Sequence, residues 1–156
     1  MFLNIYHPKF NFIYAINSNS DFLHQAITEE QKETLREKLK ANALACSSEL
    51  GFTDEQLKQW KEEKKTPDDS NKCFVACMFK KSGLIDDQGL YSESTALEKI
   101  KPYLSEARKD EVNASIKACS SVNEQSVGDG SAGCDRAILL YKCFQQQKEL
   151  VCFRLT

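Results

Sequence analysis

A chain of 156 residues in which 41% are hydrophobic and 28% are charged has the composition of one globular domain with a real core. Its formal net charge is only −2 and its lysines are interspersed with acidic residues, which argues against a nucleic-acid-binding surface. No stretch has the roughly 18 uncharged apolar residues of a membrane-spanning helix, so we expect no membrane insertion.

We interpret residues 1–20 as a degenerate signal peptide or an N-terminal extension outside the fold. The segment is rich in Phe, Ile and Tyr, as the apolar part of a leader would be. However, His7, Pro8 and Lys9 interrupt that apolar run, and only a poor cleavage pattern follows it. An ordered N-terminal extension is the alternative interpretation.

Two capping boxes predict where the first two helices begin. Thr28 is followed three residues later by Gln31, and Thr53 is followed in the same way by Gln56. In this motif the threonine and glutamine side chains satisfy backbone N–H groups that the start of a helix leaves free. The first helix is expected to end near Gly51, a residue type that favours helix C-termini.

The third helix is expected to follow Pro67, before which the second helix must end. Three polar residues are candidates for its N-cap, namely Asp68, Asp69 and Ser70. The helix carries two cysteines and two large apolar residues, namely Cys73, Cys77, Phe74 and Met78.

Three further helices are predicted in the second half of the chain. Thr95 opens a short fourth helix, which Pro102 limits. Apolar spacing predicts a fifth helix over residues 105–120, whose stripe includes Leu104 just before it. Residues 121–133 hold three glycines and are expected to be a loop, and a sixth helix follows over residues 134–147.

The predicted fold class is all-α with about six helices, since no segment alternates polar and apolar residues as a half-buried strand does. We assign the helical domain to residues 28–147. Residues 148–156 form a C-terminal tail that is more apolar than a solvated terminus requires.

Seven cysteines between Cys46 and Cys152 indicate disulfides in a secreted protein. A metal site is not expected, because there is no Cys-x-x-Cys motif and the only histidines, His7 and His24, precede every cysteine. The same lack of a core histidine, together with the absence of nucleotide-binding glycine motifs, argues against an enzyme.

Helix geometry disfavours two of the cysteine pairings. Cys73 and Cys77 are four residues apart on one helix, so their side chains run side by side and are poorly placed to bond each other. Cys134 and Cys143 are nine residues apart, which places them on opposite sides of the sixth helix. Each of these two helices is therefore expected to be linked to two different partners, and the pairing itself stays open.

The cysteine spacing over residues 28–147 resembles that of the insect odorant-binding proteins. Their signature has three residues between the second and third cysteines and eight between the fifth and sixth. Here three residues separate Cys73 from Cys77, and eight separate Cys134 from Cys143. The resemblance implies three interlocked disulfides, namely Cys46–Cys77, Cys73–Cys134 and Cys119–Cys143. Cys152 lies outside the six-cysteine pattern and is expected to be a free thiol, with an intermolecular disulfide or a buried small side chain as the alternatives.

The resemblance also implies a function. It predicts a secreted carrier that binds small hydrophobic ligands, odorants or pheromones, reversibly in an apolar cavity and brings them through aqueous fluid to olfactory receptors. No cofactor is implied, and we expect a monomer or a weak homodimer. The alternatives are a non-olfactory carrier of lipid-like, fatty-acid-like ligands and a secreted interaction protein on the same scaffold.

Large apolar residues on the predicted helices are the candidates for the cavity wall. For each of them, plain core packing is the alternative role. The set consists of Leu57, Trp60, Phe74, Met78, Leu97, Ile116, Tyr141 and Phe144. In the tail, Phe153 is a candidate lid residue, with a frayed terminus as the alternative.

Overall fold

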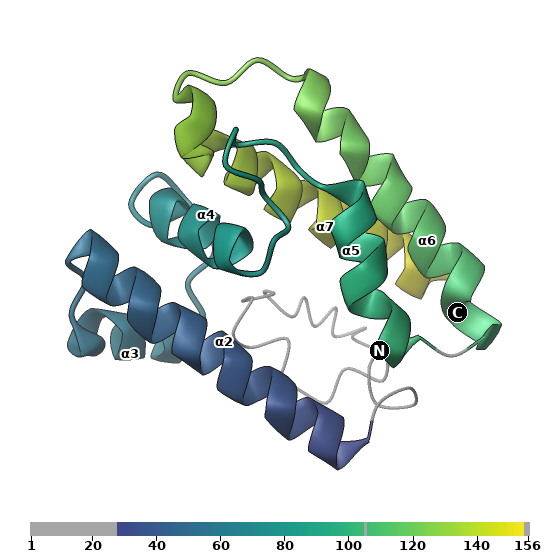
Figure 1. Cartoon of the computed structure of the whole chain (residues 1–156), viewed down its shortest axis with the longest axis horizontal. Coiled ribbons are helices and arrows are strands. Elements are labelled where there is room, and N and C mark those ends of the chain that lie inside the picture. Colours follow the sequence, from purple (N-terminus) through teal and green to yellow (C-terminus); the bar gives the residue numbers. More distant parts are fainter. Residues whose placement is uncertain (1–27, 105, 155–156) are drawn as a thin grey trace, which may run out of the picture.

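The computed structural model describes residues 28–104 and 106–154, in which six α-helices and no strand are found. The predicted all-α class is therefore confirmed for the described residues (Figure 1). The predicted leader, residues 1–20, lies outside them, as do the side chains of Cys152 and Phe153. The helices are α2 (Glu29–Leu50), α3 (Asp54–Glu62), α4 (Lys72–Lys81), α5 (Glu93–Ile100), α6 (Lys109–Ala118) and α7 (Cys134–Arg154).

Both predicted capping boxes are present. The Gln31 backbone N–H donates to Thr28 Oγ1 at 3.1 Å, and the Thr28 N–H donates to Gln31 Oε1 at 2.9 Å. Thr53 and Gln56 make the same reciprocal pair at the start of α3. Helix α2 ends before Gly51, whose φ of 73° lies in the left-handed region that favours glycine, as predicted.

The predicted cap of α4 was wrong. The N-cap residue is Asn71, and its side chain makes no capping hydrogen bond. Asp68 instead accepts from the backbone N–H and the hydroxyl of Ser70, while Asn71 Oδ1 accepts from the Asp68 N–H at 2.8 Å. The Asp68 carboxylate is thus used in a turn before the helix. Its hydrogen bonds to Ser70 take the place of a capping bond to the first N–H groups of α4.

Helices α5 and α6 both begin at positions other than those predicted. Ser92 is the N-cap of α5, and Thr95 lies within the first turn and donates its N–H to the Ser92 hydroxyl. Helix α6 begins only at Lys109, because the chain after α5 forms two short 3₁₀ turns, the first of which contains Pro102. Leu104 therefore precedes α6 and is not part of its stripe.

The predicted loop over residues 121–133 also contains 3₁₀ turns, at Cys119–Glu124 and Gly130–Ala132. Helix α7 runs to Arg154 and so extends beyond the predicted end at Gln147. The reason is visible in the sequence, since no glycine or proline follows Gln147 to stop the helix. Most of the predicted tail therefore has a helical backbone.

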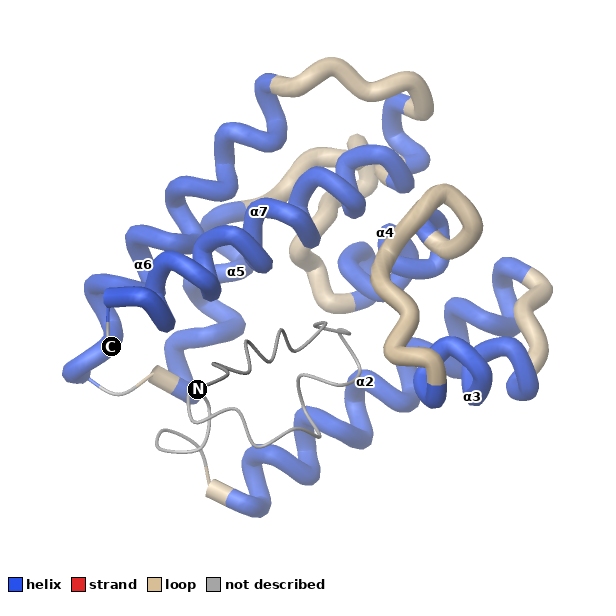
Figure 2. The backbone as a smooth tube through the Cα atoms, turned by 180° about the vertical axis from the view of Figure 1, so that it is seen from behind, coloured by secondary structure: helices blue, strands red, loops and turns tan. Residues whose placement is uncertain are grey.

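Helix α4 lies between α2 and α7 in both views of the molecule (Figures 1 and 2). Apolar side chains gather on two sides of it. The α2–α4 cluster contains Ala43, Cys46, Phe74 and Met78, bordered by residues of α3. The larger α4–α7 cluster contains buried residues of α4, α5, α6 and α7, among them Phe79, Ala96, Ile116, Leu140 and Tyr141.

Candidate functional site

Three disulfides hold this arrangement together. Within α4, Cys77 is bonded to Cys46 of α2 and Cys73 to Cys134 at the start of α7. Cys143, further along α7, is bonded to Cys119, which directly follows α6. The Cα atoms of the three pairs are 5.8, 4.5 and 5.7 Å apart. These are the pairs that the family resemblance implies, and they make α4 and α7 each a link between two other segments.

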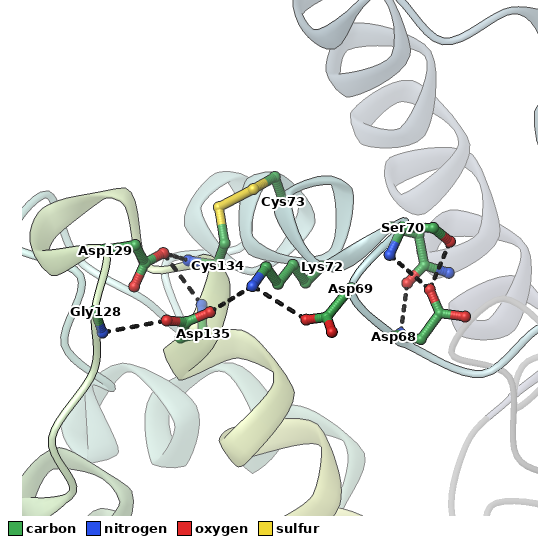
Figure 3. A network of polar contacts seen from close by, with 10 residues as sticks. Asp68, Asp69, Ser70, Lys72, Cys73, Gly128, Asp129, Cys134 and Asp135 are labelled. Carbon is green, nitrogen blue, oxygen red and sulfur yellow. Dashed lines mark hydrogen bonds and ion pairs between the residues drawn. A yellow bond between two sulfur atoms is a disulfide. The ribbon is translucent and has the colours of Figure 1, made fainter.

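A polar network lies beside the disulfide between α4 and α7 (Figure 3). Lys72 Nζ lies 2.7 Å from Asp135 Oδ1 and 3.1 Å from Asp69 Oδ1. The hydrogen bonds to Asp135 and then Asp69 raise the pKa of Lys72 above its ordinary value. The Lys72 ammonium, followed by the Gly128 N–H, lowers the pKa of the Asp135 carboxyl. The ammonium of Lys72 and the carboxylates of Asp69 and Asp135 therefore stabilise one another where the starts of α4 and α7 are joined.

Asp129 caps the N-terminus of α7 from the preceding loop. Its Oδ2 atom accepts from the backbone N–H of Cys134 at 2.6 Å and from that of Asp135 at 3.1 Å. Sequence analysis missed this cap, because Asp129 precedes the helix by five residues and reaches it only through the Gly130–Ala132 turn. The cap and the disulfide fix the first turn of α7 together.

Four of the eight predicted wall residues lie in or beside the α2–α4 cluster. Phe74 and Met78 are buried there, while Leu57 and Trp60 of α3 are half-buried at its border. The rings of Phe52, Trp60 and Phe74 meet edge to face, with centroids 4.9 to 6.0 Å apart. Phe52, which lies just before α3, thus packs against Trp60 of that helix and Phe74 of α4.

The other four lie in or beside the α4–α7 cluster. Ile116 and Tyr141 are buried, whereas Leu97 of α5 and Phe144 of α7 are half-buried at the border. Phe144 meets Tyr91 edge to face, with ring centroids 5.7 Å apart. Burial raises the pKa of Tyr141 to about 12, so its hydroxyl stays neutral and can act only as a neutral hydrogen-bonding group.

The structure therefore divides the predicted set twice. It separates the residues between two clusters on either side of α4, and it separates deeply buried residues from half-buried ones. The half-buried group is better placed to meet a ligand, since the buried side chains are already covered by protein. Several half-buried apolar residues beside the α4–α7 cluster are missing from the predicted set, and Ile100 is one of them. Its i+3 spacing from Leu97 could have revealed it.

The side chains of the described residues contain no group of three or more His, Cys, Asp or Glu residues that could hold a metal ion. Nor does any helix in this part of the chain have the length and apolar character to cross a membrane.

Sequence comparison gives matches over the described domain. A model of the PBP/GOBP family matches residues 28–147. General odorant-binding protein 56a of Drosophila melanogaster is 28% identical over 123 residues, which are 78% of this chain and 78% of that protein. Odorant-binding protein 10 of Aedes aegypti is 25% identical over 112 residues, or 70% and 73% of the two chains.

Solved structures show the same likeness. Odorant-binding protein dmelOBP28a of Drosophila melanogaster superposes with a TM-score of 0.58 at 27% identity, covering 76% of this chain and 94% of its own. The fatty acid binding protein OBP56a from the oral disk of the blowfly Phormia regina also superposes with a TM-score of 0.58 at 27% identity. The match covers 81% of this chain and 98% of the blowfly chain.

Proposed function

Because the chain belongs to the PBP/GOBP family of small carriers of hydrophobic ligands, we propose that it is a secreted carrier of odorants or pheromones. It binds them reversibly and brings them through aqueous sensory fluid to an olfactory receptor. Names of relatives support this, since the fly and mosquito proteins are odorant-binding proteins. Secretion agrees with the three disulfides, because these persist in oxidising compartments.

The half-buried border of the α4–α7 cluster is the proposed contact surface for the ligand. Leu97 and Ile100 lie one turn apart on α5, and Phe144 belongs to the same cluster from α7. These side chains keep apolar surface that a ligand can cover, and this is the observation that carries the assignment. Covering roughly 200 Å² of apolar surface would contribute about 5 kcal/mol before the entropy cost of binding.

Disulfides help to keep such a surface open to a ligand. Two of the three hold α7, one at its first residue, Cys134, and one near its middle, at Cys143, so the helix that carries Phe144 is fixed without needing a fully packed core around it. Each loop closure is typically worth about 2–4 kcal/mol, mainly through the unfolded chain. The scaffold can therefore leave apolar side chains incompletely covered.

A second ligand class is favoured by one specific comparison. The blowfly protein with the same fold is named a fatty acid binding protein. A carrier of lipid-like molecules would use the same apolar surface, so the two functions differ in the ligand and not in the scaffold. Displacement of a bound fluorescent probe by a panel of volatile odorants and long-chain fatty acids separates them, according to which class competes at the lower concentration.

The end of α7 is the proposed lid of the site. The helix continues past Lys148 to Arg154, through the stretch that includes Phe153. A chain truncated after Lys148 should bind the panel more weakly and release ligand faster. Unchanged affinity for every ligand would refute the lid while leaving the carrier function untouched.

A further inference from the structure

Asn113 begins the sequence Asn113-Ala114-Ser115, which has the Asn-x-Ser form that accepts N-linked glycans. No other asparagine in the 156-residue chain is followed two positions later by Ser or Thr. The chain therefore offers a single acceptor sequence of this kind, and the structure decides whether its asparagine can carry a large polar substituent.

Asn113 lies at the side of α6, between the stripe that faces the core and the exposed face. It is half-buried, and the residues one turn before and after it, Asp110 and Lys117, are exposed. Core contacts of the helix come from Val112 and Ile116 instead. Helix α6 runs along the rim of the molecule in both views (Figures 1 and 2). Because Asp110 and Lys117, one turn on either side of Asn113, are exposed, a group attached to Asn113 can extend past them into solvent.

Asn71 shows how a structural asparagine differs. It is 5% exposed, its amide nitrogen donates to the Thr66 carbonyl, and its amide oxygen accepts from the Asp68 N–H. For the Asn113 side chain, no hydrogen bond occurs within the part of the chain that the structure describes. Its amide is therefore not used to hold the fold.

We propose that Asn113 is N-glycosylated as the chain passes through the secretory pathway, an inference that rests on the secretion proposed above. The co-reactant is a lipid-linked oligosaccharide. The Asn113 amide nitrogen bonds to the anomeric carbon of the sugar and loses a proton. The bond from that carbon to the lipid pyrophosphate oxygen breaks, and the pyrophosphate keeps the electron pair.

Transfer precedes the folding of α6. In the folded helix the Ser115 hydroxyl donates to the Glu111 carbonyl at 3.0 Å, so it is engaged within the helix. An acceptor sequence must present its hydroxyl residue to the transferase in an extended chain, and this is available only before the helix forms. The glycan is then carried on the outer face when Cys119, one turn further on, pairs with Cys143.

The test is expression of the full chain in insect cells behind a cleavable leader, so that entry into the pathway does not depend on its own residues 1–20. We expect the secreted wild-type protein to move faster on a gel after treatment with an amidase that cleaves the Asn–glycan bond. Peptide mass spectrometry should place the glycan on Asn113. Asn113→Gln and Ser115→Ala should each abolish the shift, and Ser115→Thr should preserve it.

Asn42→Gln is the matched control, since Asn42 is a half-buried helical asparagine outside any acceptor sequence, and it should leave the shift unchanged. Secreted wild-type protein whose Asn113 peptide carries no glycan would overturn the proposal. Binding of an apolar probe by the same secreted material is scored separately, so loss of the carrier function and loss of the glycan give different results.

Discussion

Lys72 Nζ lies 2.7 Å from Asp135 Oδ1, and the residues beside them in the sequence, Cys73 and Cys134, are joined by a disulfide. An ion pair and a covalent bond thus connect the same two helix starts (Figure 3). The ion pair is partly exposed, so solvent and salt screen it and its own contribution to stability is small. The disulfide is the stronger link, and the ion pair aligns the ends that it joins.

Removing this disulfide should loosen the start of α7 first. The double substitution Cys73→Ser with Cys134→Ser avoids a free thiol and should lower the unfolding free energy by about 2–4 kcal/mol. Hydrogen exchange should rise most in the first turns of α7. Cys46→Ser with Cys77→Ser is the control and should raise exchange in α2 instead. Equal changes in both helices for both variants would contradict the distinct roles assigned to the two links.

The Asp129 cap should be worth a measurable part of the stability. Asp129→Ala removes the acceptor of the Cys134 and Asp135 N–H groups and should cost about 0.5–2 kcal/mol in urea unfolding. Asp129→Asn keeps an acceptor oxygen and should lose much less. If both variants are as stable as the wild type, the α7 N-terminus does not depend on this cap.

Acid should weaken the turn before α4. Hydrogen bonds from Lys65 and Ser70 lower the pKa of Asp68 from 3.8 to about 2. Because the folded value is the lower one, this stabilisation is present above pH 3.8 and is lost as the pH falls toward 2. It should amount to less than about 1 kcal/mol, since the pair is partly exposed and screened.

Thermal unfolding across this pH range checks the Asp68 prediction. The difference in midpoint between wild type and Asp68→Asn should be constant above pH 5 and shrink between about pH 4 and 2. The control is Asp87→Asn, at an exposed position in the turn after α4, and it should show no such change. A difference that persists unchanged at the lowest pH would contradict the assignment.

Local signals in the sequence identified the helices well. The Thr28 and Thr53 capping boxes and the glycine at position 51 act within four residues, so the sequence alone locates those ends. The cap of α4 failed because Asp68 has two local uses, and the turn was the one realised. The end of α7 was predicted too early, at Gln147, although no later residue breaks the helix.

The candidate site was predictable in composition and not in arrangement. Helical spacing marks Trp60 and Phe144 as inward-facing, but it cannot tell which neighbouring helix each one meets. The structure places them in different clusters because α4 lies between α2 and α7. The sequence also did not predict how deeply each side chain is buried. Met78 is 2% exposed and Leu97 is half-buried, although both are simply apolar helix residues in the sequence.

Trp60 offers a direct way to locate the ligand, because it is the only tryptophan in the chain and lies beside the α2–α4 cluster. A ligand on the α4–α7 border should leave Trp60 emission nearly unchanged at saturation. A large change in emission would move the ligand to the Leu57 and Trp60 side of α4, which is the competing location.

Equilibrium binding of one apolar fluorescent probe to the oxidised protein tests the central claim most directly. We expect saturable binding to the wild type and about tenfold weaker binding to Leu97→Ala or Phe144→Ala, since each removes apolar contact worth about 1.4 kcal/mol or more. Leu44→Ala, at a position 48% exposed on α2, should bind like the wild type. Failure of the folded wild type to bind any apolar probe would contradict the carrier function.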